Sequence, residues 1–323
     1  MAHMVTADTA KEDSRDILNR LTLCSHLNPW FLYVTPERVA KSKVLIAKLQ
    51  KCYELGCLMR IVCDECHCVA MDGMDFRPDY LKLAVLRNAF PTVPMLGCTA
   101  TATQRNLDTV AKNLKLKGCV RFVGDFDRPN LQLRVIFKNE NEKTHIDSIG
   151  ELIKVEHPGQ VGIVYCLSRK DTETTAEQLR ANHGIQAQAF HANMDDASLR
   201  SVHDAWRVGR LKVVCATIAF GMGINTHSCR FVIHSTMSKG LDCYWQEAGR
   251  AGRDGQPASC IVFARGADLC RLSSMLADSP NSQLQLTRLY AAFQMLLAVP
   301  SQCRRTALLR WFGQVWASHQ PPP

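Results

Sequence analysis

The sequence predicts an α/β protein of two parallel-sheet lobes, the first incomplete, followed by a short helical tail. Short β-branched or apolar runs alternate with amphipathic segments, as in repeated strand–helix units on a parallel sheet. The polar, proline-containing stretch 125–130 suits a linker between the lobes, and helical periodicity takes over from about residue 281. We therefore expect domains over residues 1–128, 129–280 and 281–323.

The individual elements follow from the same patterns. In the first lobe, apolar runs predict strands near residues 31–34, 60–64, 95–98 and 119–123. In the second lobe, they predict strands near residues 131–137, 161–165, 187–190, 212–216, 231–234 and 259–263. Helices are expected in the gaps. The tail helices are indicated by Leu284, Leu286, Leu289, Tyr290 and Phe293, and then by Leu308, Leu309 and Phe312.

Composition narrows the class of protein. The 323 residues suit two domains of ordinary size, and 46% hydrophobic with 21% charged residues are globular values. A net charge of +9 favours polyanionic partners, although charge alone describes steering rather than function. The chain has no secretory segment and no apolar run that could span a bilayer, so we expect an intracellular protein without a membrane partner.

The most informative stretch is residues 246–255, here named the arginine turn. Arg250 and Arg253 stand three residues apart among small residues, with Gly249 and Gly252 leaving room for close backbone approach. Planar guanidinium groups in such a setting can hold phosphate oxygens and neutralise charge on a transferring phosphoryl group. The alternative is an ordinary basic surface turn.

A second signal is the apolar run that ends in Asp64 and Glu65. Open α/β sheets bind ligands at the carboxyl ends of their strands, so Asp64 could hold Mg²⁺ through its water shell and Glu65 could polarise an attacking water. Taken alone, such a pair is more often solvated acids at an ordinary strand end. The order of motifs favours the site, because Thr99 to Thr101 follow the next apolar run and the arginine turn comes later.

This order resembles superfamily 2 helicases, and the wording resembles the RecQ family, including its short vertebrate RecQL-type members. The matching segments are residues 32–37 (motif Ib), 64–67 (II), 96–103 (III), 162–168 (IV), 190–193 (IVa), 214–224 (V) and 246–255 (VI). Residues 126–130 and 230–234 are also similar to RecQ sequences between the motifs. The resemblance implies two RecA-like lobes, and it runs through nearly the whole chain.

The resemblance implies an ATP-dependent 3′-to-5′ DNA helicase of repair and recombination, nuclear, with ATP and Mg²⁺ as cofactors. Single-stranded and forked DNA would be its partners, together with helicase partners. By position in the motifs, the catalytic candidates are Asp64, Glu65, His67, Gln246, Arg250 and Arg253. The nucleotide candidates are Asp64, Asn225, Arg250 and Arg253, with Asp64 on the metal. The DNA candidates are Thr35, Phe76, Arg77, Ser168, Arg169, His191 and Thr217.

Several departures from the family pattern bear on activity. No Gly-Lys dipeptide occurs, so the P-loop that cradles phosphates is missing and the first lobe is expected to be half present. Asp72 stands where the family has tryptophan, and Asn225 where it has aspartate. We expect this chain alone not to hydrolyse ATP. The alternative function is a noncatalytic DNA-binding or regulatory helicase-like protein.

Zinc is not expected. The tail resembles the start of the RecQ zinc-binding subdomain, but Cys303 is the single one of its four thiolate ligands present. The fifteen cysteines are scattered singly, often inside apolar runs, which indicates reduced and buried thiols rather than disulfides. Cys63, Cys66, His67 and Cys68 have ligand-like spacing, but no second cysteine pair lies nearby in the sequence, so buried thiols are the preferred interpretation.

Overall fold

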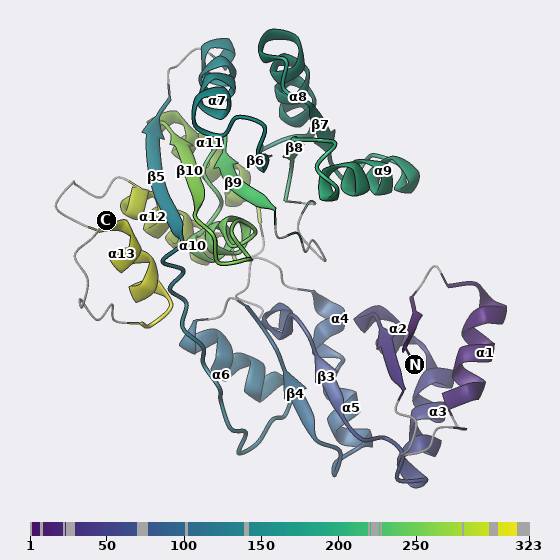
Figure 1. Cartoon of the computed structure of the whole chain (residues 1–323). Coiled ribbons are helices and arrows are strands. Elements are labelled where there is room, and N and C mark those ends of the chain that lie inside the picture. Colours follow the sequence, from purple (N-terminus) through teal and green to yellow (C-terminus); the bar gives the residue numbers. More distant parts are fainter. Residues whose placement is uncertain are drawn as a thin grey trace. The chain divides into compact units, whose positions relative to one another are not determined.

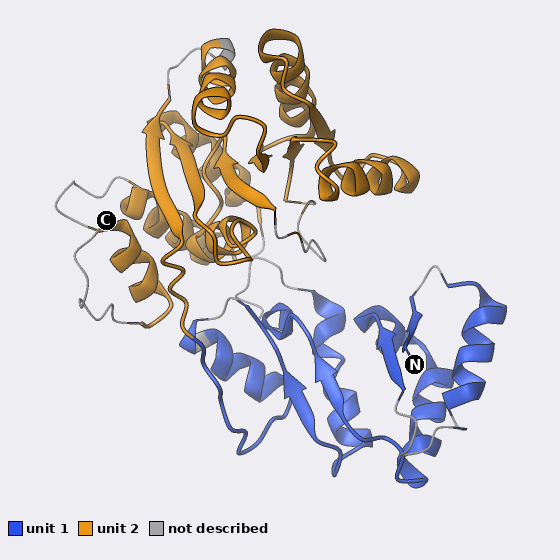
Figure 2. Cartoon of the chain, in the orientation of Figure 1, with its two compact units in different colours: residues 1–124 blue, residues 125–323 orange. Residues whose placement is uncertain are grey.

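The computed structural model describes residues 2–6, 9–21, 23, 30–69, 77–100, 103–138, 142–218, 220, 226, 228–279, 281–296 and 303–314 (Figure 1). The chain divides into two compact units, residues 1–124 and residues 125–323, drawn in blue and orange in Figure 2. Each unit has a hydrophobic core of its own. We therefore treat each as a separate domain.

Unit 1 contains two separate pairs of parallel strands. Strands β1 (Ala2–Val5) and β2 (Phe31–Val34) form one pair, and β3 (Ile61–Cys63) and β4 (Met95–Gly97) form the other. The helices are α1 (Lys11–Leu21), α2 (Pro36–Lys41), α3 (Lys43–Glu54), η1 (Cys66–Val69), α4 (Pro78–Leu81), α5 (Ala84–Ala89) and α6 (Gln104–Asn113). Their apolar faces meet in one core around Leu45, Phe90 and Leu114.

The prediction of a strand near residues 119–123 is wrong. This segment has no regular structure, and Val120, Phe122 and Val123 are 77%, 90% and 60% exposed. An alternating apolar run becomes a strand only where a neighbouring strand supplies hydrogen-bond partners and a core covers one face. Residues 119–123 have neither, and they lead out of unit 1. Strand β1, by contrast, was not predicted.

The strand pairs of unit 1 each leave apolar side chains in solvent. Phe31, Tyr33, Val62 and Leu96 are all about half exposed or more, although they belong to parallel strands. Parallel strands are normally covered on both faces. Unit 1 therefore presents uncovered apolar strand faces, a kind of surface that favours association with other molecules.

Unit 2 is built on a six-stranded parallel sheet with the order β5-β10-β9-β6-β8-β7. Its strands are β5 (Leu131–Phe137), β6 (Val161–Tyr165), β7 (Ala187–Phe190), β8 (Val213–Ala216), β9 (Cys229–His234) and β10 (Ala258–Ala264). All six strands predicted for this part of the chain are confirmed. The intervening helices are α7 (Glu142–Glu156), α8 (Arg169–His183), α9 (Asp196–Arg207), α10 (Leu241–Ala248) and α11 (Gly266–Ala277).

Helices cover both faces of this sheet. Leu179 of α8 packs with Val164 in one buried cluster, which α7 also joins, whereas Trp206 of α9 packs with Ile163 in the other. Consecutive residues of a strand point to opposite faces, so Ile163 and Val164 serve the two clusters in turn. The indole of Trp206 also donates to the carbonyl of Gly162 at 3.0 Å, which fixes α9 against β6.

The tail forms helices α12 (Ser282–Leu296) and α13 (Arg304–Trp311), as the sequence predicts. Leu289, Phe293, Leu308 and Phe312 are buried in the same cluster as strand residues of the sheet. The tail is therefore an integral part of unit 2. No described helix is both long and apolar enough to cross a membrane.

Candidate functional site

The predicted nucleic-acid residues of unit 2 gather at one edge of its sheet. Because all six strands are parallel, their carboxyl ends meet at the same edge, where open α/β sheets bind ligands. His191 directly follows β7, Thr217 directly follows β8, and Ser168 comes three residues after β6. Since β6, β8 and β7 are neighbours in the sheet, the fold brings these residues to adjacent strand ends.

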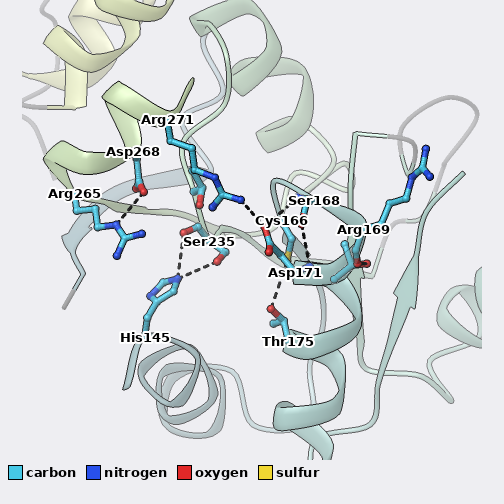
Figure 3. Close-up of polar contacts among 12 residues, drawn as sticks. His145, Cys166, Ser168, Arg169, Asp171, Thr175, Ser235, Arg265, Asp268 and Arg271 are labelled. Atoms are coloured by element: carbon cyan, nitrogen blue, oxygen red, sulfur yellow. Dashed lines mark hydrogen bonds and ion pairs between the residues drawn. The ribbon is translucent and has the colours of Figure 1, made fainter. Parts of the chain in front are cut away.

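Ser168 and Arg169 stand at the start of helix α8. The Ser168 hydroxyl accepts a hydrogen bond from the amide of Asp171 at 3.1 Å, and the Asp171 carboxylate accepts one from the Ser168 amide at 3.1 Å. This reciprocal cap fixes the helix terminus. Arg169 is exposed and extends away from the capping contacts (Figure 3). A helix start with an exposed guanidinium can receive a phosphate group.

His191 and Thr217 are held in place by contacts within unit 2. The His191 ring is almost completely buried, and its Nε2 lies 3.1 Å from a carboxylate oxygen of Glu173. The amide of Thr217 donates to the carbonyl of Phe190 at 3.3 Å, which ties the end of β8 to the end of β7. Both residues are thus fixed at the edge of the sheet by the fold itself.

The arginine turn begins in the last residues of helix α10 and holds one of its two arginines inside the protein. Arg250 is 7% exposed, donates from Nη1 to the carbonyl of Gln246 at 2.9 Å, and lies 5.7 Å from the centre of the Tyr165 ring. The ring face stabilises the positive charge. The Nε atom of Arg250 is buried and has no hydrogen-bond partner among the described residues. Gln246 is half-buried and lies one helical turn earlier.

Positive charges are concentrated around this turn. The pKa of Arg253 is lowered, mainly by loss of solvation and then by the neighbouring cations Arg250 and Arg128. The three guanidinium groups repel one another. A bound anion would relieve this repulsion. The turn therefore has the electrostatic character expected of a phosphate-binding segment.

A buried polar network lies beneath the arginine turn and was not identified from the sequence. Glu247 is 6% exposed and accepts hydrogen bonds from the Ser238 hydroxyl and from His234 Nε2, the latter at 2.9 Å. The His234 ring stacks on Tyr165, whose hydroxyl donates to the carbonyl of Phe220 at 2.7 Å. Because Tyr165 also carries Arg250 on its ring, the network sets the position of that guanidinium.

In unit 1, Asp64 and Glu65 form the turn at the end of strand β3. Asp64 is exposed, and its Oδ1 accepts a hydrogen bond from the Glu65 amide at 2.9 Å. Glu65 has φ of 48°, a left-handed conformation that is uncommon for residues other than glycine. Such backbone strain clusters at functional sites, and here it coincides with the predicted carboxylate pair.

The fold also joins this turn to the segment after strand β4. The amide of Cys66 donates to the carbonyl of Cys98 at 2.8 Å, and His67 Nδ1 lies 2.8 Å from the Thr99 hydroxyl. The same Nδ1 is 3.3 Å from a Glu65 carboxylate oxygen. Glu65, His67 and Thr99 are therefore brought together in unit 1, from segments that the sequence separates by more than thirty residues.

The cysteines beside these residues are buried thiols. Burial raises the pKa of Cys63 to about 11, and burial with the neighbouring thiols raises that of Cys66 to about 12. Both thiols are therefore protonated at neutral pH, and both pack in the hydrophobic core of unit 1.

The other candidates are spread over both units. Thr35 caps helix α2, its hydroxyl accepting from the Arg38 amide at 3.4 Å. Arg77 is half-buried and precedes α4, and Cys303 is exposed and precedes α13. Phe76 and Asn225 lie outside the described residues.

The chain is similar to known helicases in both sequence and structure. Residues 144–255 match the helicase conserved C-terminal domain family. The chain is 42% identical to "ATP-dependent DNA helicase Q-like 2" of Arabidopsis thaliana over 97% of its own length, and 40% identical to "RecQ-like DNA helicase BLM" of Xenopus laevis over 88%. It spans 44% and 21% of the length of these two relatives.

A solved structure supports the fold. The helicase MrfA bound to DNA and AMPPNP has a TM-score of 0.64 with this chain at 16% identity, covering 97% of this chain and 45% of MrfA. At this identity the likeness concerns the fold alone, which is the α/β architecture of RecA-like helicase lobes with a helical tail.

Proposed function

We propose that the chain is part of an ATP-dependent 3′-to-5′ DNA helicase that acts in DNA repair and recombination in the nucleus. The reason is its similarity to RecQ helicases over most of its length. Its similarity to RecQ helicases is 39–43% identity along 79–98% of the chain. By itself the chain binds DNA and does not turn over ATP. The alternative is a noncatalytic DNA-binding or regulatory role.

The observation that carries the proposal is the cationic arginine turn of unit 2. Arg250 is buried, its Nε has no hydrogen-bond partner among the described residues, and Arg253 lies near both Arg250 and Arg128. A buried guanidinium among other cations suits a ligand with several negative charges, such as the phosphates of a nucleotide. A nucleoside triphosphate would supply the phosphoanhydride bond whose hydrolysis drives helicases.

The carboxylates of unit 1 fit Mg²⁺ in a supporting role. Mg²⁺ is usually held by one or two carboxylates together with water and phosphate oxygens, and Asp64 and Glu65 supply two carboxylates on one turn. Asp64 would hold the ion through water, and Glu65 would orient a water molecule, with His67 keeping the Glu65 side chain in place. The described residues contain no cluster of three or more potential metal ligands.

The DNA contacts are proposed for the carboxyl edge of the sheet in unit 2. Ser168, Arg169, His191 and Thr217 lie at adjacent strand ends there. Single-stranded and forked DNA would bind mainly through phosphate groups, so affinity would depend little on sequence and strongly on salt. Other helicase subunits would be further partners.

Arg169→Gln is expected to weaken binding of single-stranded DNA by about fivefold or more, because one charge-assisted phosphate contact contributes about 1 kcal/mol or more. The slope of log affinity against log salt should also become shallower by about 0.7. Fluorescence anisotropy of a labelled oligonucleotide across a salt series measures both quantities.

The matched control is Arg134→Gln. Arg134 lies within β5 and forms an ion pair with Glu156, so the variant removes the same charge away from the carboxyl edge. Equal effects of the two variants would reduce the result to net charge and reject the proposed DNA edge.

A second expectation concerns ATP. We expect DNA-stimulated ATP hydrolysis by this chain to equal that of its Arg253→Ala variant, because these 323 residues contain no Gly-Lys pair to cradle the phosphates. Loss of one preorganised donor alone lowers turnover by about a hundredfold or more. A phosphate-release assay compares the two proteins. Turnover by the wild-type chain that Arg253→Ala abolishes would contradict the proposal that the chain is inactive alone.

A further inference from the structure

The backbone of the arginine turn is braced by Arg128, which precedes strand β5. The Nη2 of Arg128 donates to the carbonyl of Ala251 at 3.1 Å and to that of Gly252 at 2.8 Å, directly before Arg253. Its other acceptor among the described residues is the Asn130 side-chain oxygen at 3.4 Å. None of these acceptors is a carboxylate, so Arg128 both braces the turn and adds positive charge to it.

Asn130 braces the same turn from its other side. Its Nδ2 donates to the carbonyls of Gly252 and Gln256, both at 2.9 Å. Gly252 has φ of 58°, and a Cβ atom there would come within 2.5 Å of Asn130 Nδ2. Only glycine fits this position, which explains the close approach of the linker to the turn.

Helix α13 of the tail in turn contacts the linker segment 125–130, which contains Arg128. Arg305 donates to the Asp127 carboxylate at 2.6 Å and to the carbonyl of Arg128 at 2.8 Å. Phe126 stacks on Phe312 with ring centres 4.6 Å apart. These contacts are largely buried, because the Arg305 and Asp127 side chains are 13% and 19% exposed. The tail and the linker therefore form one connected layer.

We infer that Arg128 and Arg305 are positioning residues for the arginine turn. Helix α13 fixes the linker through Arg305, and the linker fixes the turn through Arg128, so the tail sets the orientation in which Arg253 meets a polyphosphate. The inference rests on the proposed function, which gives the turn a phosphate ligand. A substitution in the tail is therefore expected to alter phosphate binding although the substituted residue does not contact the ligand.

The test measures binding of inorganic tripolyphosphate to the full chain by isothermal titration calorimetry. Arg305→Gln is expected to weaken binding by about threefold to tenfold, as for other residues that act through an intermediary. The matched control is Arg304→Gln on the same helix. The Arg304 guanidinium donates only to the carbonyl of Leu296, at 3.5 Å, among the described residues, so this variant should bind as the wild type does.

Hydrogen exchange separates positioning from general damage. In Arg305→Gln, the amides of residues 251–256 should exchange faster, because the contacts that hold the turn are weakened. The amides of the sheet should keep their wild-type rates, because the core contacts are unchanged. Arg305→Lys retains a donor and should restore part of the affinity. If Arg305→Gln fails to fold, the same comparison is made between Arg305→Lys and Arg304→Gln.

The outcomes distinguish the inference from the function on which it rests. If Arg253→Gln binds tripolyphosphate as tightly as the wild type, the phosphate-binding role of the turn is wrong. If Arg253→Gln loses binding but every Arg305 variant behaves as Arg304→Gln does, the turn binds phosphate and the positioning role of Arg305 is overturned.

Discussion

Asp268→Asn is expected to destabilise unit 2 by about 3–5 kcal/mol, the usual cost of removing one partner from a buried ion pair. Asp268 and Lys138 are 1% and 4% exposed, and the Lys138 ammonium lies 2.7 Å from the Asp268 carboxylate. The variant leaves the ammonium buried without its carboxylate. The carbonyl of Ser235, at 3.0 Å, cannot compensate for that charge.

The same carboxylate also organises the start of helix α11. It accepts a hydrogen bond from Arg265 Nε at 3.1 Å, and Figure 3 shows this contact beside the His145 and Ser235 pair. Burial lowers the pKa of Lys138, whereas Asp268 acts in the opposite direction. Asparagine would remove the opposing influence and lower that pKa further. The defect should therefore be smaller at high pH, where the amine is neutral.

Urea unfolding of the wild type and the variant measures this loss. Glu156→Gln is the control, because it breaks the pair between Arg134 and Glu156, whose side chains are 42% and 36% exposed, and should cost at most about 1 kcal/mol. Replacing both Lys138 and Asp268 with apolar residues of similar size should recover most of the stability. A loss in Asp268→Asn no larger than that in Glu156→Gln would show that the buried pair contributes little.

The strands of unit 2 could be predicted because both faces of their sheet are covered, so that consecutive residues are mostly apolar. Strands β6 and β10 are buried along their whole length, and such continuous apolar runs are the mark of central parallel strands. The run at 119–123 has a polar residue between apolar ones, as a half-buried strand would, but it has no neighbour to pair with, which local sequence does not reveal. Strand β1 was missed because Ala2–Val5 is four residues long and pairs with a strand that begins at Phe31.

The candidate site shows a similar limit. Asp64, Glu65 and Arg253 could be proposed from the sequence because they stand in short motifs whose residue types indicate their chemistry. Arg128 could not, since it acts on carbonyl groups more than 120 residues away, and its segment looked like a linker. Glu247 was missed because its importance comes from burial against His234, which depends on the packing of α10 on β9.

Acidification below pH 6.5 is expected to weaken unit 2 through His145. The pKa of this histidine is lowered from 6.5 to about 4, first by burial and then by the positive charge of Lys138, with Arg265 adding to it and Asp268 opposing it. Its Nε2 lies 3.1 Å from the Ser235 carbonyl, so Nε2 carries the proton of the neutral ring. The charged ring would need a second proton on Nδ1, which is buried without a partner among the described residues.

The direction of the pH effect follows from these two protonation states. Between pH 4 and pH 6.5 the unfolded chain binds a proton at His145 that the folded chain does not bind, so stability rises with pH across this window. The contribution is fully present above pH 6.5 and is lost as pH falls to 4. Its full size is about 3 kcal/mol, because folding lowers the pKa from 6.5 to about 4.

Comparison with His145→Gln isolates this contribution, because the other acidic groups titrate in both proteins. Between pH 7 and pH 4.5 the wild type should lose about 2–3 kcal/mol more of its free energy of unfolding than His145→Gln does. His203→Gln removes a partly exposed histidine of helix α9 and is the control for loss of an imidazole elsewhere in unit 2. If His145→Gln and the wild type lose the same free energy, the imidazole gains a proton without cost, and water must reach Nδ1 beside Phe263.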